Sequence, residues 1–96
     1  MATYIALVNQ TDQGIRNVKD IPQRNAAFMS MAEKMGIAVK GVYYTVGEYD
    51  IVVVMEGTDE AIAAALLKVG SIGNIRTQTM RAFSLDEIKK VIDRMP

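Results

Sequence analysis

The chain has 96 residues, enough for one domain, and half of them are hydrophobic, which is ample for a core. Its formal net charge is zero, with 11 basic and 11 acidic side chains, which argues against a nucleic-acid-binding protein because such proteins usually carry a basic excess. The chain has no cysteine and no histidine, which excludes disulfides, thiolate chemistry and a histidine acting as general base or metal ligand.

The first predicted strand runs from Thr3 to Asn9 and carries apolar residues on both faces, which is typical of a strand buried on both sides. A polar connector from Gln10 to Lys19 follows. Asp20 is a suitable N-cap for the next helix, which is predicted to end near Met35, before Gly36.

The inner stripe of this helix indicates how it meets the sheet. Its members recur at helical spacing, and Arg24 lies on the same stripe one turn earlier, so we expect Arg24 to lean towards the sheet. The stripe consists of Phe28, Met31, Ala32 and Met35.

Residues Gly41 to Met55 are predicted to form a β-hairpin. The second strand starts near Ile37 and contains Lys40 and Gly41, which is typical of an edge strand. Residues 47–50, Gly-Glu-Tyr-Asp, form the predicted turn, in which we expect a positive φ at Gly47. The third strand is predicted from Tyr49 to Met55, and because it is apolar at every position from Ile51 we place it centrally.

Two further helices flank the fourth strand. Thr58 is the predicted N-cap of the first, whose stripe is Ile62, Ala65, Leu66 and Val69, with Gly70 and Gly73 closing it. The fourth strand, Asn74 to Ala82, contains polar residues typical of an edge. Ser84 and Glu87 fit a capping box at the start of the last helix, which we expect to pack through its apolar side chains. These are Leu85, Ile88, Val91 and Ile92.

The element order is β-α-β-β-α-β with an added C-terminal helix, spanning residues 1–96 as one domain. This order predicts an α+β, ferredoxin-like fold with an antiparallel sheet in the order 4-1-3-2. Two helices can cover only one face of this sheet, and the central strands are apolar on the other face as well. We therefore expect a homodimer or a higher oligomer to cover the open face.

A binding site is expected at the end of the sheet where the first strand ends, the hairpin turns and the fourth strand begins. Polar side chains collect there, although loops at sheet ends are polar in any case. The candidate ligand-binding residues are Asn9, Thr11, Gln13, Lys19, Arg24, Tyr44, Tyr49, Asp50, Arg76 and Thr77.

Asp50 and the two tyrosines admit more than one role. Asp50 is a candidate general base with Tyr49 as its acid or orienting group, but an aspartate at this position more often caps a turn or pairs with an arginine. We expect Arg76 to be that partner, with Arg24 as the alternative. Tyr44 and Tyr49 can orient a ligand, or pack across strands.

At residues 47–50 the sequence resembles the GYD domain family, whose name comes from a Gly-x-Tyr-Asp motif. The resemblance covers nearly the whole chain and includes Thr11 to Ile15, Lys19-Asp20, and Gly73 to Thr77. It implies a dimeric α+β barrel. Related barrels include cofactor-free monooxygenases, isomerases, haem enzymes and amino-acid-sensing domains, and a haem with a proximal histidine is excluded by composition. The resemblance also implies a serine where Ile21 stands.

We therefore expect a cytoplasmic homodimer that binds a small polar or anionic metabolite at the loop end of the sheet. Arg24 and Arg76 would hold the anion. The alternatives are a cofactor-free isomerase or monooxygenase with Asp50 as base, and a structural or protein-interaction dimer. No cofactor, metal, nucleic acid or membrane partner is expected. No signal peptide is expected either, since the first residues lead straight into a strand.

Overall fold

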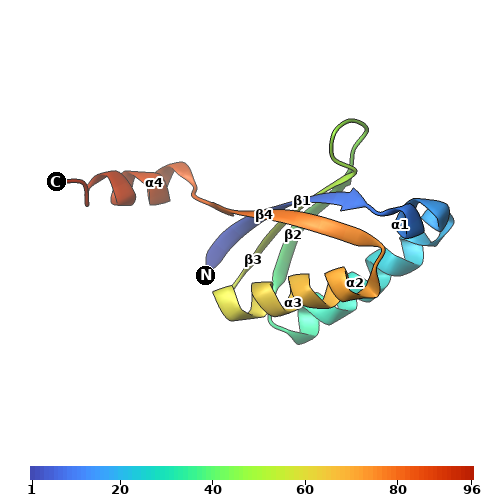
Figure 1. Ribbon diagram of the computed structural model, residues 1–96. Helices are drawn as coiled ribbons and strands as arrows, with labels where there is room; N and C mark the ends of the chain where they lie inside the picture. The colour runs from blue at the N-terminus through green and yellow to red at the C-terminus, as the bar shows by residue number, and fades with distance from the viewer.

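The computed structural model describes residues 1–96 and contains one four-stranded antiparallel sheet with two long helices on one face (Figure 1). The strands lie in the order β2-β3-β1-β4, which is the predicted 4-1-3-2 order counted from the other edge, so the ferredoxin-like fold is confirmed. The two strands with apolar residues on both faces, β1 and β3, are central as predicted. The strands are β1 (Ala2–Gln10), β2 (Ala38–Tyr44), β3 (Ile51–Gly57) and β4 (Ile75–Ala82).

The helices are α1 (Asp12–Arg16), α2 (Ile21–Lys34), α3 (Asp59–Ile72) and α4 (Leu85–Ile92), with a 3-10 turn η1 (Val18–Asp20) before α2. The prediction of a plain connector between β1 and α2 was therefore wrong, because Thr11 starts a short helix by accepting a hydrogen bond from the Gly14 N–H at 3.1 Å. Asp20 occupies the N-cap of α2, but its side chain makes no capping bond, which corrects a second expectation.

The core lies between the sheet and the two long helices. Ala6 and Val8 of β1 and Val53 and Met55 of β3 are buried there. The predicted helix stripes meet them: the buried residues are Ala32, Ile62 and Ala65, and the partly buried residues packed on the core include Phe28, Met31, Met35 and Leu66. Gly70 lies within α3 and does not close it. Gly73, with φ of 95°, is the residue that ends this helix.

The hairpin loop is longer than predicted. β2 ends at Tyr44 and β3 begins at Ile51, so residues 45–50 form the loop and Tyr49 lies outside the strand. Thr45 joins the two ends of this loop. Its N–H donates to the Asp50 carbonyl at 2.8 Å, and its hydroxyl donates to the Tyr49 carbonyl at 2.6 Å. Gly47 has φ of 152°, which confirms the expected positive value.

Asp50 fastens this loop to the end of β1. Its N–H donates to the Val8 carbonyl at 2.8 Å, and its Oδ2 accepts a hydrogen bond from the Gln10 N–H at 2.7 Å. The expected ion pair of Asp50 with Arg76 or Arg24 was wrong, since the one ion pair in the structure joins Arg81 to Glu87 at 3.9 Å. A backbone donor takes the place of the predicted arginine.

The last helix projects from the rest of the domain. In Figure 1, α4 lies beyond the end of β4, away from the sheet and from both long helices. Its predicted capping box is confirmed: the Ser84 N–H donates to Glu87 Oε1 at 2.9 Å, and the Glu87 N–H donates to Ser84 Oγ at 3.2 Å. The expected packing of α4 through its apolar side chains is not found within the chain, because the helix projects away from the sheet and both long helices. Leu85 is 69% exposed and Ile92 is 54% exposed.

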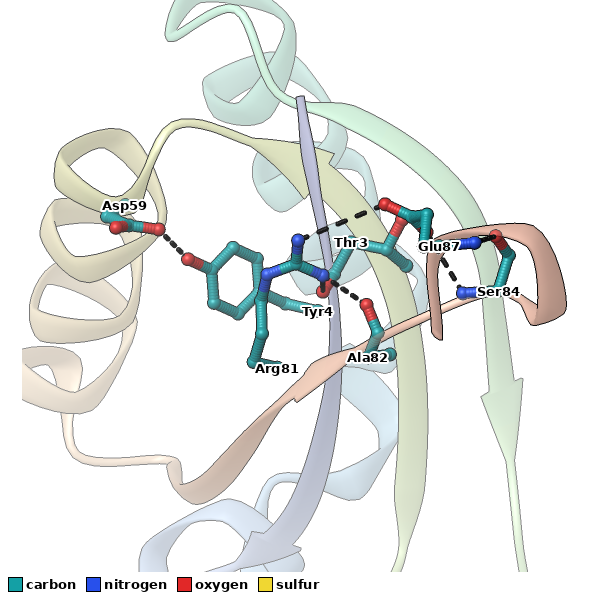
Figure 2. A network of polar contacts seen from close by, with 7 residues as sticks. All are labelled: Thr3, Tyr4, Asp59, Arg81, Ala82, Ser84 and Glu87. Atoms are coloured by element: carbon teal, nitrogen blue, oxygen red, sulfur yellow. Dashed lines mark hydrogen bonds and ion pairs between the residues drawn. The ribbon is translucent and has the colours of Figure 1, made fainter. Parts of the chain in front are cut away.

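A network around Arg81 holds the base of this helix (Figure 2). The Arg81 guanidinium lies 4.3 Å from the centre of the Phe83 ring and 5.9 Å from that of Tyr4, and it bonds the carbonyls of Thr3, at 3.3 Å, and Ala82. The Tyr4 hydroxyl donates to Asp59 at the start of α3. Together with the Arg81–Glu87 pair, these contacts join β1, α3 and β4 to the first turn of α4.

Replacing Asp50 by alanine is expected to lower the free energy of unfolding by about 1–3 kcal/mol, because the Gln10 N–H loses a charged acceptor in a partly buried position. Asp50→Asn keeps an acceptor oxygen and should cost less. Glu48→Ala, in the same loop and without a hydrogen bond, serves as the control. Urea unfolding followed by circular dichroism measures all three, and an Asp50→Ala variant as stable as the wild type would contradict the assignment.

The capping box should make the first turn of α4 sensitive to acid. The Ser84 backbone N–H, then the Ser84 hydroxyl, and to a smaller extent the charge of Arg81 lower the pKa of Glu87 from its ordinary value of 4.5. A folded-state pKa below the unfolded value stabilises the turn above pH 4.5, and this stabilisation is lost as the pH falls through the lowered pKa.

We expect an NMR titration of the Glu87 carboxyl carbon to give a midpoint below 4.5, with the Ser84 amide signal shifting over the same range. Ser84→Ala should raise that midpoint, and Lys89→Ala should leave it unchanged. A midpoint that Ser84→Ala does not move would show that the box is absent in solution.

Candidate functional site

A cavity of about 350 Å³ lies between the sheet and the two long helices, at the end of the sheet that carries the hairpin loop. Residues of α2 from Ile21 to Met31, the second half of α3 and parts of all four strands surround it. This is the end at which the sequence placed a site. The walls, however, are mainly apolar and include Phe28, Val42, Val53 and Val69, which the prediction of a polar binding site did not foresee.

Three of the ten predicted site residues line this cavity, namely Arg24, Tyr44 and Thr77. Each comes from a different element, α2, β2 and β4 respectively, so the fold does bring together side chains that are far apart in the sequence. Ile21, which stands where the family resemblance implied a serine, lines the cavity as well and adds to its apolar wall.

Arg24 leans towards the end of β1 as expected, but it bonds neutral oxygens. Its Nη2 donates to the side-chain oxygen of Gln10 at 3.4 Å, to the Gly14 carbonyl at 3.2 Å and to the Asn17 carbonyl at 3.1 Å. Its Nε is buried and has no hydrogen-bond partner. The guanidinium therefore lies beside the cavity with no carboxylate to neutralise it.

Thr11 and Gln13 hold α1 against the loop between α3 and β4. The Thr11 hydroxyl donates to the Gly73 carbonyl at 2.6 Å, and Gln13 Nε2 donates to the side-chain oxygen of Asn74 at 3.0 Å. The two segments are so close that a Cβ on Gly14 would lie 2.0 Å from the Asn74 carbonyl oxygen. The bonds of Thr11 and Gln13 are thus structural contacts next to the cavity.

The remaining predicted residues lie around this end of the sheet without lining the cavity. Asn9 and Lys19 are exposed. The Tyr49 hydroxyl donates to Gln78 Oε1 at 3.0 Å, and the Arg76 guanidinium lies beside Gly70 of α3. Asp50 is engaged by the backbone of β1, as described above.

Three polar residues that line the cavity are absent from the ten predicted ones: Asn25, Lys68 and Asn74. Helical spacing carried the signal for Asn25 and Lys68. Asn25 precedes Phe28 by three positions on α2, and Lys68 follows Ala65 by three on α3, so each shares a face with a core residue. None of the ten predicted site residues lies on α3.

The structure contains no group of three or more acidic, cysteine or histidine side chains placed to hold a metal ion. None of its helices combines the length and the apolar character needed to cross a membrane.

Two known proteins are similar to this chain over most of its length. A Thermus thermophilus protein named "Glutamine synthetase and cystathionine beta-lyase binding protein" is 32% identical over 90 residues, which is 92% of this chain and 95% of that protein. A solved structure described as "crystal structure of FFRP-DM1" superimposes with a TM-score of 0.59 at 27% identity, covering 86% of this chain and all of that one.

The family comparison agrees with the residues of the hairpin loop. Residues 4–92 match the GYD domain, which extends from β1 to the last residue of α4. The match therefore includes the sheet, both long helices, the cavity and the projecting helix. This chain belongs to the GYD domain family.

Proposed function

We propose that this chain is a homodimeric, cytoplasmic binding protein whose partner is another protein. The observation that supports the dimer is that the chain exposes more surface to solvent than a compact monomer of its mass should. A compact monomer of 10.6 kDa is expected to expose about 5,500 Å², whereas this chain exposes 6573 Å². The excess of about 1,100 Å² is more than the roughly 800 Å² that each partner contributes to a standard interface.

Two apolar surfaces make up this proposed interface. One is the sheet face opposite α2 and α3, where strand alternation places Ile5, Leu7, Val54 and Met80. The other is the exposed apolar side of α4. Because both surfaces belong to one chain, a two-fold arrangement lets each copy cover the other in the same way.

The protein partner is inferred from the relative in Thermus thermophilus, whose printed name states that it binds glutamine synthetase and cystathionine beta-lyase. Identity of 32% over almost its full length supports the same class of partner here. The chemistry of the chain agrees with a binding role, because Asp50, the candidate general base, does not line the cavity and uses Oδ2 to hold the Gln10 N–H.

A second candidate function is the binding of a small metabolite, and the cavity of about 350 Å³ favours it. Its volume lies at the lower end of the range for ligand pockets, roughly 300–1,000 Å³. Of the two residues predicted to hold an anion, Arg24 lines the cavity and Arg76 does not. The proposed dimer interface and the cavity lie on different parts of the domain, so one protein can have both.

The dimer proposal predicts that substitutions on α4 weaken association without unfolding the domain. Sedimentation velocity at low micromolar concentration should show a dimer for the wild type and a folded monomer for Ile92→Glu. Lys90→Glu, on the same helix but outside its apolar side, is the control and should remain dimeric. A wild-type protein that sediments as a stable folded monomer would overturn the proposal.

The partner proposal predicts that the immobilised wild-type dimer binds purified glutamine synthetase or cystathionine beta-lyase from the same organism. Biolayer interferometry at two salt concentrations measures the affinity, with serum albumin as an unrelated control. If neither enzyme binds more tightly than albumin, the partner class taken from the relative does not apply to this chain.

A further inference from the structure

We infer that the cavity binds a small carboxylate that has an apolar body and no amino group. This inference rests on the second candidate function, the binding of a small molecule between the sheet and the helices. It adds the chemical class of the ligand, which follows from the cavity's walls, its charges and its size.

The walls favour an apolar body. Of the 20 residues that line the cavity, 15 are hydrophobic. They come from both long helices and from all four strands, so an apolar ligand would meet such side chains on the sheet side and on the helix side. Moving an apolar group from water into such a site is favourable in proportion to the area removed from water. A fully polar metabolite would lose its hydration and find few partners here.

The charges favour an anionic head group. Arg24 and Lys68 are the two charged residues that line the cavity, and both are cations. Arg24 forms no ion pair, and its three hydrogen bonds all come from Nη2, while Nε is buried without an acceptor. A ligand carboxylate would supply the missing counter-charge and oxygen acceptors. Asn25 and Asn74 line the same cavity and add amide donors.

The same charges disfavour an amino acid. No aspartate or glutamate lines the cavity, so a ligand ammonium group would find two cations and no carboxylate. Burial of a charge without a partner of opposite charge is strongly unfavourable. The site therefore discriminates between an acid and the corresponding α-amino acid.

The volume sets the size of the ligand. A water molecule occupies roughly 30 Å³ of liquid, so a cavity of about 350 Å³ holds on the order of a dozen non-hydrogen atoms. Octanoate and 3-phenylpropionate are in this range and fit the proposed class. Both serve as probes, and neither is claimed to be the natural ligand.

Isothermal titration calorimetry with the wild-type protein tests the class directly. Octanoate should bind at one site per chain. Octanol, which has the same apolar chain, should bind about tenfold more weakly or worse, because hydrogen bonds to charged groups are the stronger ones. Octylamine should not bind measurably, and 3-phenylpropionate should bind more tightly than phenylalanine.

Variants then identify the residue that reads the carboxylate. Arg24→Gln should reduce octanoate affinity by about tenfold while leaving that of octanol unchanged. Since Arg24 also bonds α1, Lys68→Gln is the second variant, on an exposed residue whose loss should not unfold the domain. Arg76→Gln is the matched control, because this arginine lies at the same end of the sheet but does not line the cavity.

Each outcome separates the class of ligand from the function on which it rests. If octanol binds as tightly as octanoate, the cavity binds small molecules but the carboxylate inference is wrong. If Arg76→Gln weakens octanoate binding and both Arg24→Gln and Lys68→Gln do not, the anion is held elsewhere and the inference is wrong. If no probe binds, both the class and the small-molecule function are overturned, whereas the protein-binding proposal is unaffected.

Discussion

The structure depends on a sheet whose two central strands are apolar on both faces. The two long helices, α2 and α3, cover only one of these faces. The buried side chains of β1 and β3, Ala6, Val8, Val53 and Met55, point towards α2 and α3 and form the core. The intervening residues Ile5, Leu7 and Val54 point the other way, where the chain supplies no cover. The open apolar face of the sheet follows from this unequal coverage, and it adds to the surplus of exposed surface.

The sequence predicted most of the fold because its signals are local and consistent. The strand order followed from the contrast between apolar central strands and edge strands carrying Lys40, Gly41 or Arg76. The capping box of Ser84 and Glu87 and the left-handed glycine at the end of α2, Gly36, are short-range features that neighbouring residues decide. Two of the errors occurred where a distant segment intervenes: Thr11 starts α1 next to the loop that follows α3, and Asp50 binds the backbone of β1.

The cavity lies at the end of the sheet where the sequence placed the candidate site, but its walls are mainly apolar. Arg24 leans towards the sheet as expected. The apolar walls could not be predicted from a list of polar residues, because they arise from the spacing between helices and sheet, which depends on all the packed side chains at once. Tyr49 and Arg76 were predicted to line the site, but they do not line the cavity. They lie near the right loop, but one bonds Gln78 and the other lies beside Gly70.

The projection of α4 separates the residues that stabilise the fold from the exposed apolar residues proposed for association. Its apolar residues make no contact with the core, so their replacement leaves the packing of β1, β3, α2 and α3 intact. Substitutions of these apolar residues therefore carry no penalty in monomer folding, while they alter the surface proposed for association. The network of Arg81 with Tyr4 and Phe83 fixes where this helix starts, so such changes alter its surface and not its direction. A domain built in this way can change its proposed association surface while keeping its core.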